Sequence, residues 1–410
     1  MSQKKAITLY LHVHQPFRVR QYSVFDTGES HDYFNEPNYN SERNNEAVFK
    51  KVADKSYRPM NALLLKLLRE HEDFKLSLSI TGTFIDQAEQ WAPDVIESFQ
   101  ALVATGKVEI VAETYHHSLA FFYSRNEFEK QVTLHRDKIK TLFGVTPKVF
   151  RNTELAYNNE LAQWADSQGY EGILAEGWDP ILQWRSPNYV YRPPATKNIS
   201  LLLKNYRLSD DLAFRFSDQS WGEWPLTADR YTDWLRQATE DAPLVNLFMD
   251  YETFGEHQWH ETGIFGFFEE TVRTWLQDKD NTFTTVSDAI TANPPSDEID
   301  VPYTVTWADT ERDLSAWNGN RLQQEALKYL YRLESDILRT KDEQLINDWR
   351  YLQASDLVYY MCTKNLDDGA VHAYFSPYES PYDAFLFFMN VIRDLRWRLI
   401  QDHKTGGLHG

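Results

Sequence analysis

The chain has 410 residues, 42% of them hydrophobic, which is enough for one large α/β barrel with an appended domain or for two or three smaller units. Its formal net charge of −19 argues against a nucleic-acid-binding surface, because phosphate recognition needs clustered lysine and arginine. The single cysteine, Cys362, excludes a disulfide framework and a thiolate metal cluster.

The sequence predicts neither a signal peptide nor a membrane helix. The residues after Met1 lack the apolar run and the small-residue cleavage site of a signal peptide. No stretch has the length of a membrane helix. We therefore expect a cytoplasmic protein with no membrane association, and the sequence carries no indication of an oligomeric state.

Short apolar or alternating runs predict strands in the first part of the chain, at 7–13, 74–80, 108–111, 148–151, 172–175, 200–203 and 244–250. Helical patterns lie between them, for example at 61–70, 94–105, 127–143, 160–168 and 230–239. Strands that alternate with helices imply a parallel sheet. About seven such strands within roughly the first 290 residues favour a barrel over an open sheet.

A boundary is expected after the barrel. Residues 291–302 contain three prolines and several acidic residues, which is typical of a linker. Long amphipathic helical patterns follow at 321–338, 344–363 and 382–401. The predicted organisation is a barrel at 1–295, a helical domain at 296–403 and a disordered tail at 404–410.

Unusual polar residues follow several predicted strands. His12 and His14 end the first strand, the cluster 113–117 (ETYHH) follows the third, Glu154 follows VFRNT, and Asp250 ends LVNLFM. Any one of them alone is more often a solvated loop residue. In a parallel barrel, however, reactive groups gather at the C-terminal ends of the strands, so the four together indicate an active site.

Glu154 and Asp250 form a candidate carboxylate pair. Glycosidic bond cleavage needs one carboxylate to attack the anomeric carbon and one carboxylic acid to protonate the departing oxygen. Arg151 near Glu154 would favour an ionised nucleophile, and the apolar sequence neighbours of Asp250 would help it keep a proton. The chain is also rich in aromatic residues, with 13 Trp, 23 Tyr and 24 Phe, which suit either an aromatic core or the apolar faces of sugar rings.

Five ordered motifs, HVHQP, ETYHHSL, FRNTELAY, MDYETFGEH and TWADTERDLSAWNGN, resemble the five sequence regions of glycoside hydrolase family 57. LQASDLVYYM and YFSPYESPYDAF extend the resemblance to the α-amylase-type branch, so that it covers nearly the whole chain. The resemblance implies a (β/α)7 barrel, which is an incomplete TIM-like barrel, followed by a C-terminal α-helical bundle. It also implies a retaining mechanism on α-glucans, mainly at α-1,4 bonds, with no cofactor and no metal.

The resemblance also implies roles for individual residues. Glu154 corresponds to the nucleophile and Asp250 to the general acid/base, and their carboxyl groups are expected roughly 5–5.5 Å apart. The other residues assigned to substrate binding, by the resemblance or as additional candidates for the cleft, are His14, His117, Trp221, Trp224, Phe254, His257, Trp307, Asp313 and Trp317. Since Trp307, Asp313 and Trp317 follow the predicted linker, we expect the C-terminal region to complete the active site.

Three alternatives remain open. The same two carboxylates would serve a 4-α-glucanotransferase or a branching enzyme. A metal-dependent hydrolase or deacetylase could use His12, His14 and Asp250 as ligands, although Glu154 has no role in that scheme. A non-catalytic glucan-binding protein on the same fold is the third.

Overall fold

The computed structural model describes residues 4–364 and 375–406. The chain divides into two compact units. The first contains residues 1–14, 50–113 and 132–307, and the second contains residues 15–49, 114–131 and 308–410. The division therefore differs from the expected boundary near residue 295.

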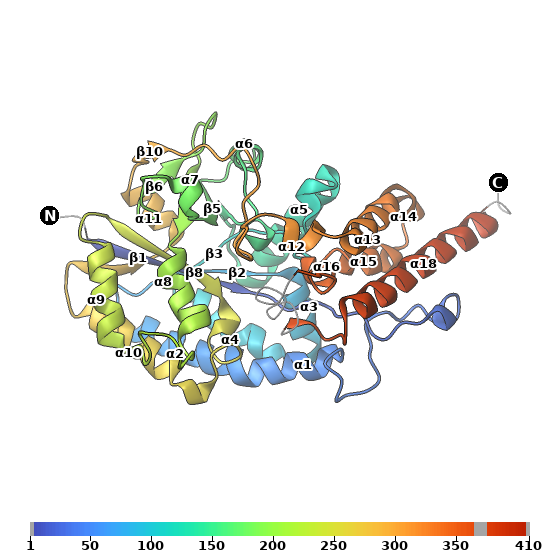
Figure 1. The fold of residues 1–410 in the computed structure, drawn as a ribbon, viewed down its shortest axis with the longest axis horizontal. Coiled ribbons are helices and arrows are strands. Elements are labelled where there is room, and N and C mark those ends of the chain that lie inside the picture. The colour runs from blue at the N-terminus through green and yellow to red at the C-terminus, as the bar shows by residue number, and fades with distance from the viewer. Residues whose placement is uncertain (1–3, 365–374, 407–410) are drawn as a thin grey trace. The chain divides into compact units, whose positions relative to one another are not determined.

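The first unit is built on two five-stranded sheets (Figure 1). The strands of the first sheet are all parallel: β1 (Lys5–Val13), β2 (Leu76–Ile80), β3 (Val108–Ile110), β8 (Leu244–Asp250) and β9 (Asn281–Thr284). β1 is central and pairs with β2, β8 and β9. Its pairing register with β8 brings His12 opposite Asp250.

In the second sheet, β5 pairs in parallel with both β4 and β7, whereas β6 is antiparallel to β7. The strands of this sheet are β4 (Val149–Phe150), β5 (Gly172–Glu176), β6 (Val190–Arg192), β7 (Ser200–Lys204) and β10 (Asp297–Glu298). β10 extends the sheet beyond β6. The strands β6, β9 and β10 were not predicted, because their residues (VYR, NTFT and DE) include few apolar side chains and form no apolar run.

The two sheets join at both edges and form a barrel. A parallel bridge pairs Ala112, just after β3, with Phe150 of β4. At the other edge, the backbone N–H of Asn205, just after β7, donates to the carbonyl of Asn246 in β8 (2.8 Å). The ring β1–β2–β3–β4–β5–β7–β8 thereby closes, which confirms the predicted (β/α)7 barrel.

The barrel strands are apolar because both of their faces are covered. Every residue of β2, β5 and β7 is buried, as expected for parallel strands between a packed interior and an outer helix layer. Tyr10, Val111, Leu174, Leu202 and Phe248 belong to one buried cluster at the interior. Their packing fixes the strands whose C-terminal ends bear the polar residues.

Helices connect the strands of the first unit, and the helices expected there are confirmed with shifted ends. They are α2 (Arg58–Glu70), α3 (Gly82–Trp91), α4 (Pro93–Val103), α6 (Asn159–Ser167), α7 (Asp179–Leu182), α8 (Tyr206–Asp210), α9 (Ala228–Ala238), α10 (Ile264–Leu276) and α11 (Val286–Ala292). Two further helices, α1 (Asn45–Val52) and α5 (Arg125–Phe143), contain residues of both units. Side chains at the N-caps, such as Thr81 and Asn158, accept backbone N–H groups and fix where α3 and α6 begin.

The expected linker at 291–302 is held in place by hydrogen bonds. β10 pairs with β6, and the backbone N–H of Asn159 donates to the carbonyl of Val301 (3.0 Å). Tyr157 and Val305 then form an antiparallel bridge. This stretch therefore lies along residues 154–159, and the prolines mark its extended backbone rather than a free connection.

The second unit contains the C-terminal helices, and two of the three long helices that the sequence pattern predicted there are divided into shorter ones. They are α12 (Ser315–Asn318), α13 (Arg321–Arg332), α14 (Glu334–Thr340), α15 (Glu343–Tyr351), α16 (Ser355–Tyr359) and α18 (Pro381–Gly406). The predicted helix at 321–338 breaks at Leu333, and that at 344–363 breaks between Tyr351 and Ser355. α18 includes residues 404–406 of the predicted tail, whereas residues 407–410 lie outside the described residues.

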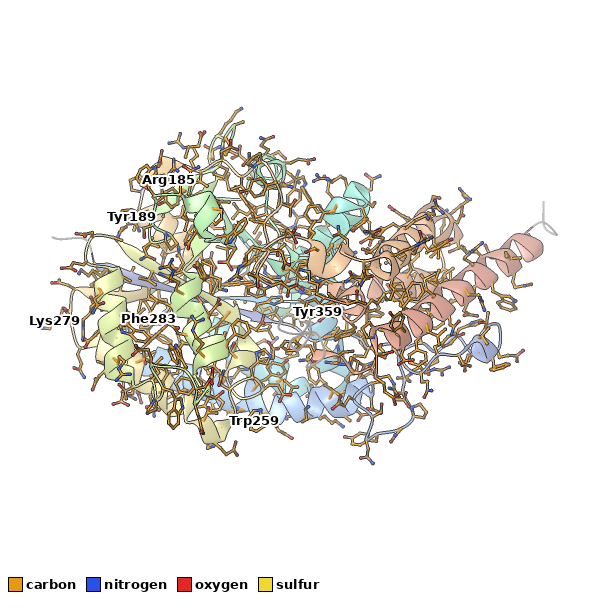
Figure 2. The ribbon with its side chains drawn as sticks, in the orientation of Figure 1. Arg185, Tyr189, Trp259, Lys279, Phe283 and Tyr359 are labelled. Carbon is orange, nitrogen blue, oxygen red and sulfur yellow. The ribbon has the colours of Figure 1, made fainter. Side chains whose placement is uncertain are left out.

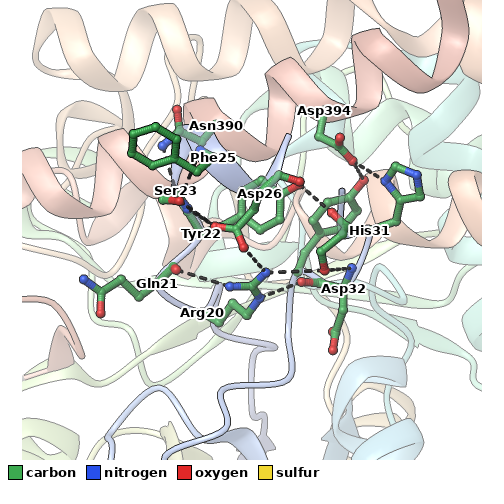
Figure 3. Close-up of polar contacts among 12 residues, drawn as sticks. Arg20, Gln21, Tyr22, Ser23, Phe25, Asp26, His31, Asp32, Asn390 and Asp394 are labelled. Carbon is green, nitrogen blue, oxygen red and sulfur yellow. Dashed lines mark hydrogen bonds and ion pairs between the residues drawn. The ribbon is translucent and has the colours of Figure 1, made fainter. Parts of the chain in front are cut away.

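A long irregular segment of the second unit, residues 15–44, is fixed by one buried carboxylate (Figure 3). Asp394 of α18 is fully buried and accepts the backbone N–H of Gly28 and the Nδ1 of His31, both at 2.7 Å. Within the segment, Arg20 donates to Asp26 (2.9 Å), as Figure 3 shows. These bonds replace the ladder that a helix or strand would provide.

Candidate active site

The C-terminal ends of β1, β3 and β8 bring three ionisable side chains into contact. The Nδ1 of His12 lies 3.4 Å from Oδ1 of Asp250, and its Nε2 lies 3.2 Å from Oε2 of Glu113. His12 and Glu113 are both buried, whereas the side chain of Asp250 is 40% exposed. His12 therefore bridges a hidden carboxylate and a carboxylate that a substrate can reach.

The environment of Asp250 differs from the one expected from its sequence neighbours. Burial by itself would raise the pKa of this carboxyl group, but the hydrogen bond from His12 and the positive charges of His12, His257 and Arg151 lower the pKa below its ordinary value. Phe248, expected to desolvate it, points into the barrel core. The expectation that apolar neighbours keep Asp250 protonated is wrong, because the hydrogen bond and charge of His12, together with the charges of His257 and Arg151, outweigh the effect of burial.

Glu252, two residues further, has the opposite tendency. Burial and the negative charge of Asp250 raise its pKa to about 8, although hydrogen bonds partly oppose this shift. Those donors are the hydroxyl of Tyr57 (2.5 Å) and the backbone N–H of His14 (3.3 Å), both to Oε1. Tyr57 ends a π-helical turn, Ala53–Tyr57, between α1 and α2. At neutral pH the site therefore contains an ionised Asp250 beside a protonated Glu252.

Gly255 shows why this motif needs a glycine. Its φ is +109°, and a Cβ built on it would lie 1.9 Å from the carbonyl oxygen of Lys55. The close approach lets the loop after β8 pack on the turn that carries Tyr57. A side chain here would separate the two segments that hold Glu252.

Glu154 follows β4 and has an unusual backbone. Its φ of 60° and ψ of 26° are left-handed, and Leu155 after it also has a positive φ of 49°. Such conformations cost a non-glycine residue of order 1 kcal/mol or more, and they cluster at functional sites. The strained backbone of Glu154 and Leu155 therefore indicates that the direction of the Glu154 side chain is important for function.

Trp307 holds Glu154 through two hydrogen bonds. Its indole Nε1–H donates to Oε2 of the carboxylate at 2.8 Å, and its backbone N–H donates to the Glu154 carbonyl at 3.2 Å. The guanidinium of Arg151 lies 4.9 Å from the centroid of the indole ring. Trp307 was expected to offer a flat face to a sugar; the structure shows that its N–H edge contacts the candidate nucleophile.

The other residues of the first unit that were predicted to bind substrate differ in their exposure and in their contacts. His14 bonds through Nδ1 to Thr81 Oγ1 at 2.9 Å. Trp221 packs against Trp234 and is partly buried, and Trp224 is 43% exposed. Phe254 is fully buried against Phe268 (5.0 Å), so a sugar could touch it only if its ring became exposed.

His257 and the exposed Trp259 lie in the loop after β8, and Figure 2 labels Trp259. Burial lowers the pKa of His257, while the charges of Asp250 and Glu256 oppose that shift. Because its charge acts on Asp250, protonation of His257 is coupled to the state of the candidate acid.

Three predicted residues belong to the second unit. His117 is buried and has a φ of 50°. Asp313 is exposed and accepts the backbone N–H of Ser315 at 2.8 Å. Trp317 is 1% exposed and packs on Tyr359, which Figure 2 labels.

Glu176 and Lys204, which end β5 and β7, were not predicted as site residues, although they form a charged cluster with Asp210. Lys204 lies 2.8 Å from Asp210 and 3.4 Å from Glu176, and its Nζ is 5.6 Å from the Trp307 ring centroid. The signal was present, because both strands end in a charged residue after an apolar run, GILAE and SLLLK.

Within the residues that the structure describes, no helix combines the length and the apolar character that a membrane crossing requires. The family model of glycosyl hydrolase family 57 matches residues 8–302. A candidate α-amylase of Methanocaldococcus jannaschii is 42% identical over 402 residues, covering 95% of this chain and 84% of its own.

Solved structures share the fold at low sequence identity. A branching enzyme of Thermococcus kodakaraensis has a TM-score of 0.67 at 14% identity, covering 87% of this chain and 86% of its own. An α-amylase of Thermotoga maritima has a TM-score of 0.62 at 14% identity, covering 98% and 97%. With the family model matching most of the barrel and a relative 42% identical over nearly the whole chain, this protein belongs to glycosyl hydrolase family 57 and is a glycoside hydrolase.

Proposed function

We propose that the protein hydrolyses α-1,4 bonds of glucans by a retaining mechanism, with Glu154 as nucleophile and Asp250 as general acid/base. The observation that carries the proposal is the setting of Glu154: its backbone is left-handed and its carboxylate accepts the Trp307 indole N–H. A hydrogen bond to the charged form favours an ionised carboxylate, which is the form that attacks.

In the first step an oxygen of Glu154 forms a bond to the anomeric carbon as the glycosidic bond breaks, and Asp250 gives its proton to the leaving oxygen. In the second step Asp250 takes a proton from water, the water oxygen bonds to the anomeric carbon, and Glu154 leaves as a carboxylate. The two carboxyl groups are expected roughly 5–5.5 Å apart for this chemistry.

Asp250 must gain a proton before the first step, although its pKa lies below its ordinary value. A bound glucan chain would cover its 40% exposed side chain. Removing that water disfavours the charged form and raises the pKa toward the working range. Substrate binding thereby favours the protonated form of Asp250, which the first step needs.

Substrate contacts by His14, His117, Trp221, Trp224, Phe254, His257, Trp307, Asp313 and Trp317 remain part of the proposal, as does the contribution of residues 296–403 to the active site. The choice of an α-1,4-glucan is supported by the name of the Methanocaldococcus relative, a candidate α-amylase. The cytoplasmic location also remains a prediction.

A second candidate is glucan transfer, because a branching enzyme shares the fold. Both activities use the same covalent intermediate and differ in whether water or a sugar hydroxyl attacks it. Incubation with maltooligosaccharides of defined length distinguishes them: hydrolysis gives only shorter products and new reducing ends, whereas transfer also gives longer or branched products. If no product of either kind forms, the protein binds glucans without cleaving them or acts on another glycoside.

The catalytic assignment is tested with a 5-fluoroglycosyl fluoride, a probe that accumulates the covalent intermediate of a retaining α-glycosidase. We expect peptide mass spectrometry to find the label on Glu154. A label on another carboxylate, with none on Glu154, would refute the assignment.

A further inference from the structure

Two cations lie over the ring of Trp307, the residue whose N–H contacts the candidate nucleophile. The guanidinium carbon of Arg151 is 4.9 Å from the ring centroid, and Nζ of Lys204 is 5.6 Å from it. Both distances are within the range of an attractive cation–π interaction. We propose that Lys204 is a positioning residue that fixes the Trp307 indole and, through it, the carboxylate of Glu154.

The backbone alone does not fix the indole. Two backbone contacts place the Cα of Trp307. The backbone N–H of Trp307 donates to the Glu154 carbonyl (3.2 Å), and Val305 forms a bridge with Tyr157. The ring can still rotate about χ1 and χ2, and only a few rotamers point Nε1 at Glu154. A cation at a defined position over the ring favours the rotamers in which the ring face meets it.

Lys204 is itself held rigidly. Its side chain is 4% exposed, and Nζ contacts Asp210 (2.8 Å) and Glu176 (3.4 Å). Glu176 is fully buried and accepts the backbone N–H of Gly177 (2.8 Å). Gly177 permits this arrangement, because a Cβ there would lie 2.1 Å from the Lys204 carbonyl oxygen.

A buried cluster of one ammonium and two carboxylates is a costly way to fill space. Removing charges from water is unfavourable, and an apolar residue of similar size often stabilises a protein equally well. The unfavourable burial is explained if the Lys204 ammonium is required at a fixed position over the Trp307 indole. The cation also draws electron density from the ring, which makes the indole N–H a stronger donor to an ionised carboxylate.

Lys204 probes this role more cleanly than Arg151 does. Arg151 also lies 3.8 Å from Glu113 and 3.5 Å from Nε2 of His12, so its removal would disturb the surroundings of Asp250 as well. Lys204 contacts Asp210, Glu176 and the ring of Trp307, so its substitution leaves the contacts of Arg151 with Glu113 and His12 in place.

The inference rests on the proposed nucleophile, and the experiment separates the two. The variants are K204M, K204R, W307F and the double variant K204M/W307F in the full-length chain. For each we would measure kcat, KM, the pH profile of kcat/KM and the rate of labelling by the 5-fluoroglycosyl fluoride. W307F keeps an aromatic ring and removes the N–H donor.

We expect K204M to lower kcat and the labelling rate at least tenfold while KM changes less than threefold. The acid limb of kcat/KM should move to higher pH, because Glu154 loses part of the bond that favours its ionised form. K204R should recover most of the rate. In the W307F background, K204M should have little further effect, since the two substitutions remove one pathway.

The control is K107M, which removes an ammonium that is 16% exposed and donates to the carbonyls of Leu68 and His71. It should lower the melting temperature and leave the acid limb in place. If K204M folds poorly, the double variant K204M/D210N takes its place in the comparison. The second substitution removes the charge of Asp210, which K204M would leave buried without its ammonium partner.

The remaining outcomes are distinct. A label on Glu154 together with unchanged labelling and pH profile in K204M overturns the role of Lys204 and leaves the proposed function standing. Additive effects of K204M and W307F also overturn it, because they would show that Lys204 acts by another route. The absence of any label on Glu154 in the unmodified protein refutes the proposed function instead.

Discussion

The pKa of Glu252 makes stability depend on pH in a direction that one substitution can test. Folding raises the pKa from its ordinary 4.5 to about 8. Between these values the folded protein keeps a proton on Glu252 that the unfolded chain releases, so the free energy of unfolding falls as pH rises. Below about pH 4.5 Glu252 contributes no penalty, and above about pH 8 the penalty is complete.

The size of the effect follows from the same two values. The difference is about 3.5 pH units, and each unit corresponds to about 1.4 kcal/mol, which gives a penalty of about 5 kcal/mol above pH 8. Glu252→Gln has nearly the shape of the protonated acid, and its Oε1 can still accept from Tyr57 and from the His14 backbone. The variant should match the parent near pH 4 and exceed its stability increasingly up to about pH 8, above which the difference should level off.

The assay is urea unfolding of both proteins at intervals from pH 4 to pH 9, with the difference in unfolding free energy plotted against pH. The matched control is Glu261→Gln, which removes an equal charge from an exposed residue of the following loop. That variant should show a flat difference. A flat difference for Glu252→Gln as well would mean that Glu252 is ionised in the folded protein, and the reasoning would fail.

Three further predictions concern activity. Glu154→Gln and Asp250→Asn should each lower turnover by orders of magnitude with little change in melting temperature, and Asp250→Asn should keep more activity on substrates with good leaving groups, which need less protonation; turnover of Glu154→Gln above about half of the parent value would contradict the assignment. Asp313→Ala should lower kcat/KM at least tenfold if Asp313 binds sugar. A lower melting temperature with unchanged kinetics would instead assign Asp313 to the bond it makes with Ser315. Prolonged dialysis against a chelator should leave activity unchanged, and a loss that added zinc restores would favour a metal-dependent mechanism over the carboxylate pair.

The polar residues at the strand ends could be predicted from the sequence, because the signal is local. An apolar run that ends in His12, in Glu154 after β4, or in Asp250 predicts a buried strand with a reactive end, and parallel strands bring such ends to one side of a barrel. The alternation of strands and helices likewise predicted the closed ring. Those inferences needed only the periodicity of neighbouring residues.

What the sequence determined by itself is therefore which residues end the strands, and what the tertiary structure decided is how these residues act on one another. The register of β1 against β8 places His12 on Asp250, and residues 297–307 return along β6 and residues 154–159 to bring Trp307 onto Glu154. Asp250 and Glu252 are two residues apart in one motif, yet their pKa values move in opposite directions. The reason is physical: desolvation and charge depend on atoms close in space, and those atoms come from strands and loops far apart in the chain.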